Sequence, residues 1–356
     1  MQLVRQYIIR LLLRLSRYSV GYRMENSAKS ILGIGNALTD IVAVLPDDAL
    51  LKEFNLPSGS MMHIDESASN IIWQRLKTMD VEYIPGGSVA NTLAGTSILG
   101  MRSSFIGKVG DDELGELYKR EQEGIGIKAT LLKGALPSGR AMVFVTAPDS
   151  ERTFAVCLGS ALELSPSELK PEFFEGYDYF HIEGYLVHNR SLVRRAVELA
   201  KSAGSIISMD LANYRIVENN DSFLHDIVEN YVDILFANEM EAKSFTKKEP
   251  REALDEMARM CKIAVVKLGP DGSMVKSGDE FYKIAPCEAK CIDATGAGDL
   301  YAAGFLYAHS LGMPIYICGQ IGSVISSKVV EVIGSRIDAG RWMEAKEETN
   351  NIMYGN

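Results

Sequence analysis

The sequence predicts an α/β protein with a mostly parallel sheet and a second, smaller β-sheet. Between residues 177 and 267, short apolar runs alternate with longer segments of helical periodicity. This alternation is typical of a parallel sheet that helices cover on both faces. Hairpin-like runs in segments 41–64 and 131–157 do not fit the alternation, and we expect them to form a small antiparallel subdomain that acts as a lid. A chain of 356 residues accommodates one large domain and a small one.

The first part of the chain predicts strands, three helices and a hairpin. Helices are indicated by apolar residues at a period near 3.6, and strands by β-rich runs that end in turn residues. Pro148, Asp149 and Ser150 supply the hairpin turn. The expected elements are strands 31–35 and 41–45, helices 66–79 and 90–99, strand 104–109, helix 112–123, and hairpin strands 141–146 and 152–156.

The second part predicts the regular alternation itself. The expected strands are 177–182, 205–210, 234–237 and 263–267, and the expected helices are 191–203, 223–229, 239–244 and 251–260. In such sheets, ligands bind at the carboxyl ends of the strands. Chemically capable residues just after each strand are therefore the candidate ligand contacts.

Composition narrows the class of partner. The net charge of −10 argues against nucleic acid or an anionic membrane as a partner. The spacing of the five cysteines matches no zinc pattern, which indicates the reducing cytoplasm.

Residues 1–23 form a basic leader with five arginines and no acid. The arginines interrupt the apolar run, so it does not read as a transmembrane span. A basic amphipathic helix and a transit peptide both fit this composition. We favour a third interpretation, in which the functional protein begins near Met24, and we assign 24–350 to the main domain.

The most informative segment is Asp293-Ala294-Thr295-Gly296-Ala297-Gly298-Asp299, which precedes the apolar run 300–307. Small residues at a helix N-terminus let several backbone amides converge on an anion. Asp299 can then take a proton from a hydroxyl held beside that anion site. The segment therefore predicts phosphorylation of an alcohol; the alternative is that the glycines only permit close packing.

Asn36 and Asp40 follow the first strand, where an amide and an acid can hold ligand hydroxyls or, alternatively, serve in a turn. Gly33 and Gly35 do not make a dinucleotide fingerprint, because Leu38 occupies the third glycine position and a strand follows.

Gly86 and Gly87 precede a helix that carries Asn91 one turn in. Paired glycines permit a hinge or a close approach of the backbone to a ligand. The alternative is a plain loop and helix start.

Asn238 and Glu241 lie at the end of an apolar strand, where an acid suits Mg²⁺ bound through water. The alternative is helix capping by Asn238. Lys267 ends another strand, and the following turn with Gly269 and Gly272 can line a nucleotide. The sequence contains no Walker A motif.

Together, and in this order along 31–334, these residues resemble the ribokinase family, also called PfkB-type carbohydrate kinases. The resemblance implies a three-layer α/β/α domain with a β-lid, MgATP as the donor and a hydroxymethyl group as the acceptor. It implies that Asp299 is the general base and that the amides of Gly296, Ala297 and Gly298 stabilise the transferring phosphoryl group.

The resemblance also implies the remaining roles. Arg152 would reach the phosphates from the lid, and Glu241 would support the Mg²⁺ waters. Asp293 would lie near a monovalent cation such as K⁺. A homodimer through the lid is a further expectation. The acceptor would contact Asn36, Asp40, Gly86, Gly87, Asn91, Glu183 and Tyr185, and the nucleotide would contact Asn238, Lys267, Gly269, Gly272, Thr295 and Gly322.

The acceptor stays open at this stage. The segments around Asn36, Arg152 and Tyr185 look like the adenosine-kinase branch, in which Tyr185 would stack on a purine. Thr295 and Glu183 look more like sugar kinases. A catalytically silent ligand sensor on the same fold is the rival class, although a sensor does not need Asp299.

Overall fold

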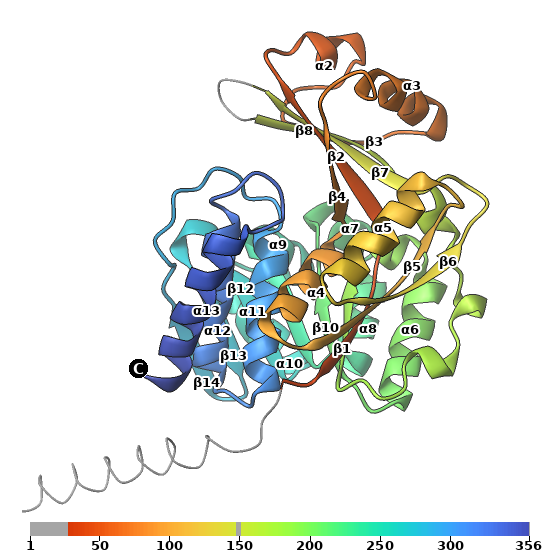
Figure 1. Ribbon diagram of the computed structural model, residues 1–356. Helices are drawn as coiled ribbons and strands as arrows, with labels where there is room; N and C mark the ends of the chain where they lie inside the picture. Colours follow the sequence, from red (N-terminus) through yellow and green to blue (C-terminus); the bar gives the residue numbers. More distant parts are fainter. Residues whose placement is uncertain (1–27, 147–150, 356) are drawn as a thin grey trace, which may run out of the picture.

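The computed structural model describes residues 28–146 and 151–355, and its centre is a nine-stranded sheet (Figure 1). The strand order is β14-β13-β12-β11-β10-β9-β1-β5-β6. Pairing is parallel from β6 to β12 and antiparallel at β13 and β14. The bounds are β1 Ser30–Ile34, β5 Arg102–Val109, β6 Lys128–Lys133, β9 Tyr179–Glu183, β10 Ile206–Asp210, β11 Ile234–Asn238, β12 Ile263–Lys267, β13 Ser273–Ser277 and β14 Glu280–Ile284.

Helices cover both faces of this sheet and divide its core in two. One apolar cluster joins the sheet to α4 (Ser88–Leu99), α5 (Glu113–Gly124), α11 (Ala297–Ser310), α12 (Ile315–Val329) and α13 (Ala339–Tyr354). The second joins the opposite face to α6 (Arg190–Ser202), α7 (Tyr214–Asn219), α8 (Asp221–Tyr231), α9 (Glu239–Thr246) and α10 (Pro250–Met260). The central strands are buried on both sides, as their continuous apolar runs predict. This three-layer α/β/α arrangement confirms the expected fold class.

A five-stranded second sheet, the small sheet, projects from the large one and carries two helices on its outer side (Figure 1). Its order is β3-β8-β7-β2-β4. The bounds are β2 Leu38–Leu45, β3 Met61–His63, β4 Glu82–Gly86, β7 Gly139–Thr146 and β8 Glu151–Cys157, with α2 Ala49–Glu53 and α3 Glu66–Leu76.

The small sheet differs from the antiparallel lid that we expected. β7 and β8 form the expected antiparallel hairpin, but β2 pairs with β7, and β3 with β8, in parallel. β4 also belongs to this sheet, whereas residues 131–133, assigned to the lid, lie in β6 of the large sheet. Local alternation cannot reveal these errors, because the pairs join segments that lie far apart in the sequence. The expected hairpin turn at 148–150 lies outside the described residues.

Two general properties follow from the described residues. None of their helices combines the length and the apolar character that crossing a bilayer requires. All five cysteines are free thiols.

Candidate active site

The chemically capable side chains meet where the parallel strands end, beneath the small sheet. Each comes from the carboxyl end of a different strand, which is the usual position of a ligand site in such sheets. They are Asn36 after β1, Glu183 on β9, Asp210 on β10, Asn238 on β11 and Lys267 on β12. α4 and α11 contribute Asn91 and Asp299 from the other side.

Asp299 lies in the first turn of α11 and is held by two donors from α4. Ser88 Oγ donates to Oδ1 at 2.7 Å, and Asn91 Nδ2 donates to Oδ2 at 3.0 Å. Burial raises the pKa of Asp299 to about 6, although both hydrogen bonds oppose the shift. The carboxylate is thus oriented, and it can accept a proton near neutral pH.

The start of α11 presents unpaired backbone amides beside a cation. Gly296 is the N-cap, with φ of 76°, and Ala297 N donates to Ala294 O at 3.1 Å. In the part of the chain that the structure describes, the amides of Gly296, Gly298 and Asp299 have no partner. A β-carbon on Gly298 would lie 2.9 Å from Lys267 Nζ. The site thus combines free amides with an ammonium group, but the amide of Ala297 is already used within the turn.

Lys267 is surrounded by more negative charge than it can balance. Its Nζ lies 2.6 Å from Asp210 Oδ2. Burial lowers the pKa of Lys267, but Asp210 and Glu241 outweigh burial and raise it overall. Burial and the charge of Asp210 raise the pKa of Glu241 to about 7.

This excess of carboxylate fits a divalent cation. No three His, Cys, Asp or Glu side chains within 28–146 and 151–355 are grouped so as to hold a metal directly. Mg²⁺ commonly keeps several waters and binds through substrate phosphates with one or two carboxylates. Glu241 and Asp210 therefore suit the outer contacts of such an ion.

Asn238 and Glu241 form a capping box at the start of α9. The Asn238 side chain accepts from Glu241 N at 2.9 Å, and Glu241 Oε2 accepts from Asn238 N at 2.8 Å. The capping alternative for Asn238 is thus confirmed. Glu241 remains 3% exposed.

Glu183 is a clamp between two site elements. Its Oε1 accepts from both N and Nδ2 of Asn36, each at 2.9 Å, and its Oε2 accepts from Val89 N at 2.9 Å. Burial raises the pKa of this carboxyl to about 7. Both oxygens are engaged with the protein, so Glu183 fixes the turn after β1 against the start of α4.

Other polar atoms at or near Asn36 have no hydrogen-bond partner among the residues that the structure describes. Asn36 is 4% exposed, and its Oδ1 is buried without a hydrogen-bond partner. The Asp40 carboxylate lies against the backbone of Gly86, where a β-carbon would come within 2.5 Å of Oδ1. Gly87 has φ of 100°, and a β-carbon there would lie 2.3 Å from Asn36 O. The two glycines are thus required by close approaches.

Arg152 links the small sheet to the loop before α11. Its Nη2 lies 2.8 Å from Asp293 Oδ2, and its Nη1 donates to Thr295 Oγ1 at 3.3 Å. Thr295 Oγ1 in turn donates to Asp293 Oδ1 at 2.8 Å.

The structure places the other predicted residues around this centre or away from it. Tyr185 follows Glu183, and its hydroxyl donates to Ala212 O at 3.2 Å. Gly269 and Gly272 form the turn between β12 and β13, both with positive φ. Gly322 lies inside α12, where a β-carbon would come within 3.0 Å of the Tyr301 ring.

Sequence reasoning missed four residues of this site. Ser88 adjoins the paired glycines and Asp210 ends a predicted strand, so each carried a local signal. Ser335 and Arg336 carried none, because they follow α12 in the chain and reach the site only through the fold. Ser335 Oγ donates to Asn91 Oδ1 at 2.9 Å, and Arg336 Nη2 donates to Pro85 O at 2.9 Å.

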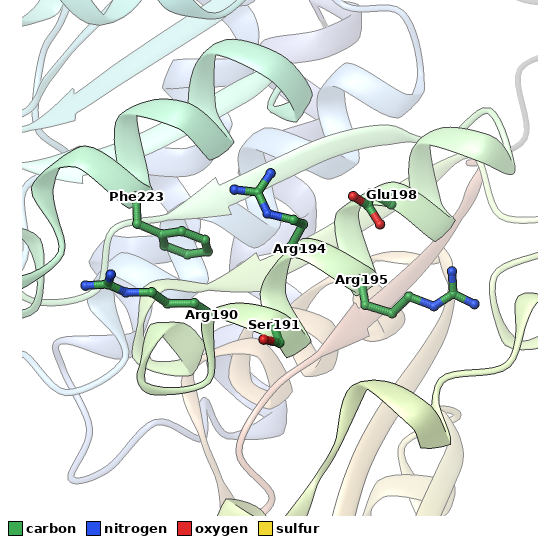
Figure 2. Close-up of a pocket in the computed structure, with 6 residues that line it drawn as sticks. All are labelled: Arg190, Ser191, Arg194, Arg195, Glu198 and Phe223. Carbon is green, nitrogen blue, oxygen red and sulfur yellow. The ribbon is translucent and has the colours of Figure 1, made fainter.

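A separate recess of about 360 Å³ lies between α6 and α8 (Figure 2). Arg190 and Arg194 flank Phe223, whereas Arg195 points away from them. Arg190 donates to Asn220 Oδ1 and Arg194 pairs with Asp226. These arginines do not converge on one point, so the recess lacks the geometry of an anion site.

Comparisons with known proteins point to one family. The model of the pfkB family carbohydrate kinases matches residues 59–340. The crystal structure of adenosine kinase from Sinorhizobium meliloti is 32% identical, with a TM-score of 0.80, over 90% of this chain and 99% of that one. An uncharacterized sugar kinase of Archaeoglobus fulgidus is 30% identical over 68% of this chain and 96% of its own length. Adenosine kinase 1 of Arabidopsis thaliana is 26% identical over 85% and 94%.

The family match covers most of the chain, and these relatives are matched over nearly their whole length. The chain therefore belongs to the pfkB family of carbohydrate kinases, as an ATP-dependent phosphotransferase of the nucleoside and sugar kinase type.

Proposed function

We propose that this protein transfers the γ-phosphoryl group of ATP to a hydroxymethyl group of a nucleoside, with adenosine as the favoured acceptor. The observation that best supports this proposal is the position of Asp299. Its carboxylate is oriented by Ser88 and Asn91 at the helix end that also presents free amides and lies beside Lys267. A base, an anion site and a cation are thus next to one another.

The reaction follows from these positions. Asp299 removes the proton from the acceptor hydroxyl, whose oxygen forms a bond to the γ-phosphorus. The bond from that phosphorus to the β–γ bridging oxygen breaks, and ADP leaves with the electron pair. The amides of Gly296 and Gly298 and the ammonium of Lys267 stabilise the charge on the transferring group. Arg152, held by Asp293 and Thr295, is available from the small sheet for the phosphates.

Mg²⁺, when bound with ATP, offsets phosphate charge and orients the phosphates. Asp210 and Glu241 would hold its waters. A role for K⁺ near Asp293 stays a prediction, since both Asp293 oxygens already have protein partners: Thr295, Arg152 and the amide of Gly334.

The acceptor side favours a ligand rich in hydroxyl groups. Asn36 Oδ1 is an unpaired buried acceptor, and the Asp40 carboxylate lies nearby at the paired glycines. Two such acceptors call for hydroxyl donors, as a ribose ring provides. Adenosine kinases among the relatives favour a nucleoside. The 30% identity to a sugar kinase makes a free sugar the second candidate.

The deciding experiment measures ADP release from MgATP with adenosine, inosine, ribose, fructose and 2-keto-3-deoxygluconate. Turnover above the acceptor-free rate with adenosine supports the proposal. Turnover only with a sugar overturns the nucleoside assignment and retains the kinase chemistry. No turnover with any acceptor, together with tight adenosine binding, favours the sensor.

A further inference from the structure

The loop between α12 and α13 contacts three separate parts of the active site. Gly334 N donates to Asp293 Oδ2 at 2.7 Å, and Ser335 Oγ donates to Asn91 Oδ1 at 2.9 Å. Arg336 Nη2 donates to Pro85 O at 2.9 Å. Pro85 directly precedes Gly86, against which the Asp40 carboxylate lies. Arg336 therefore reaches the acceptor side of the site, where no proposed role yet uses it.

Arg336 retains an unused donor there. Its Nη1 is buried and has no hydrogen-bond partner. A buried donor without a partner costs free energy unless a ligand or water satisfies it. The Nη2 bond to Pro85 fixes the guanidinium, so Nη1 presents its hydrogens from a defined position.

Asp40 presents the complementary group. After burial, the charge of Arg336 is the strongest influence on its carboxyl. Among the described residues the Asp40 carboxyl has no hydrogen bond and no ion pair within 4.0 Å, although the charges of Arg152 and Asp299 also act on it. Tyr118 and then Asp40 are the groups whose charge acts most strongly on the Arg336 guanidinium. Asp40 and Arg336 thus influence each other although no hydrogen bond or ion pair joins them, and an intervening polar group can fill that gap.

A hydroxyl group is the ligand chemistry that closes such a gap. It donates to a carboxylate and at the same time accepts from a guanidinium, whereas an ether or carbonyl oxygen only accepts. The contact with Arg336 involves a charged partner, and so does the contact with Asp40 once its carboxyl, whose pKa burial raises to about 7, is deprotonated. Charged partners make such hydrogen bonds stronger than neutral ones. Removal of the hydroxyl leaves both partners unsatisfied.

We propose that a ring hydroxyl of the acceptor, distinct from the one that is phosphorylated, bridges Asp40 and Arg336 Nη1, which makes Arg336 a specificity-determining residue. This inference rests on the proposed function. Arg336 distinguishes acceptors with that hydroxyl from deoxy analogues. A purely structural Arg336 would hold Pro85 and would be indifferent to the analogue.

The test combines substitutions of Arg336 with removal of single hydroxyl groups from the acceptor. We would measure kcat/KM for adenosine, 2′-deoxyadenosine and 3′-deoxyadenosine with the wild type, Arg336→Gln and Arg336→Lys. The wild type should prefer adenosine over one deoxy analogue by at least about 30-fold, as expected when a charged hydrogen-bonding pair is left unpaired. In Arg336→Gln, kcat/KM should fall more for adenosine than for that deoxy analogue. The preference for adenosine over the analogue should therefore shrink to about threefold or less.

Arg336→Lys keeps the positive charge near Asp40 and guards against a variant that only fails to fold. Its preference should lie between those of the wild type and Arg336→Gln. Arg341→Gln is the matched control, because Arg341 lies on α13 and pairs only with Glu331 and Asp338 among the described residues. It should retain the wild-type preference. Circular dichroism checks the fold of each variant.

Two results would overturn the inference: an equal loss of activity with all three nucleosides in Arg336→Gln, or a wild type that accepts both deoxy analogues as well as adenosine. Failure of the proposed function looks different, because the wild type then fails with adenosine itself. If ribose is the acceptor, ribose and 2-deoxyribose replace the nucleosides. If nothing turns over, calorimetric binding of adenosine and its deoxy analogues to the same variants gives the same comparison.

Discussion

Asp299 and its two donors belong to different helices, so the base depends on how α4 and α11 meet. A β-carbon on Gly95 of α4 would lie 2.6 Å from Ala303 Cβ of α11. The helices therefore approach closely at small residues. This contact brings Ser88 and Asn91 within hydrogen-bond distance of the carboxylate.

Replacement of Asp299 by asparagine should abolish the base without changing the shape of the site. We expect kcat to fall by at least about 10²-fold, the usual scale for a general base, while fluorescence titration shows unchanged ATP binding. Asp279→Asn, in the exposed turn between β13 and β14, is the control. Turnover of Asp299→Asn near that of the control would refute the assignment.

The pH dependence of kcat/KM should reveal the state of Asp299. Its pKa is raised to about 6, and only the deprotonated carboxylate accepts a proton, so activity should fall as the pH drops through about 6. Ser88→Ala removes a donor that favours the charged form, so the acid limb should move to higher pH by roughly half a unit to one unit.

Other carboxyls in the site also affect the pH at which activity falls on the acid side of the profile. Burial raises the pKa values of Asp40, Glu183 and Glu241 to about 7, and such neighbours titrate together. The informative quantity is therefore the difference between variants. Ser97→Ala, farther along α4 with its hydroxyl on Ile125 O, should leave the limb in place. An unmoved limb in Ser88→Ala would argue against Asp299 as the titrating base.

At the scale of elements, the start of α4 depends on a backbone that only glycine adopts easily. Gly87 has φ of 100°, and a β-carbon there would meet Asn36 O at 2.3 Å. Gly87→Ala should lower the free energy of unfolding by about 1–3 kcal/mol or more, measured by denaturant titration.

Gly124 provides the matched control for that substitution. It ends α5, and a β-carbon there would meet nothing within 4 Å. Gly124→Ala should therefore be neutral or stabilising by up to about 1 kcal/mol. Equal unfolding midpoints for the two variants would show that the close approach of Gly87 to Asn36 does not determine the stability of the protein.

The elements that the sequence predicted correctly are those whose signal is local. The apolar strands β9 to β12 and the helices α6, α8, α9 and α10 follow from periodicity, whereas the short helix α7 was not predicted. Asp112, the first residue of the expected helix 112–123, caps α5. Pairing is not local. The parallel register of β2 on β7 joins Thr39 to Arg140, and nothing near either residue indicates it.

The difference between local and non-local signals also explains which site residues could be predicted. Acids and glycines at strand ends were found because their types and spacing are unusual. The clamp by Glu183 was not foreseen, since an acid after a strand looks the same whether it binds a ligand or its own backbone. Arg336 was missed because it reaches Pro85 only through the fold. The place of Gly322 beside a nucleotide stays a prediction.

At the scale of the molecule, β1 is the element on which the large sheet depends. It lies between β5 and β9 and begins at Ser30. Ser30 N and Oγ both donate to Asp178 Oδ2, at 2.9 and 2.8 Å. A chain that begins at Met24 retains all of these contacts, so we expect its melting temperature and ADP release to match those of the full chain.

A chain that begins at Gly35 is the contrasting case, because it lacks β1 and divides the nine-stranded sheet. It should show no cooperative thermal transition. Loss of activity on removal of residues 1–23 alone would instead make the leader part of the working protein. Differential scanning calorimetry and the ADP assay distinguish these outcomes.

The loop from Gly334 to Arg336 also has a consequence for biosynthesis. Its bonds reach partners 41, 244 and 251 residues earlier in the chain, and among the described elements only α13 follows it. Synthesis releases the chain from the N-terminus onward, and a domain generally folds as a unit. A nascent chain therefore exposes Asp299 before Ser335 and Arg336 have emerged. The catalytic centre is completed only when translation is nearly finished, so ribosome-bound intermediates should not consume ATP.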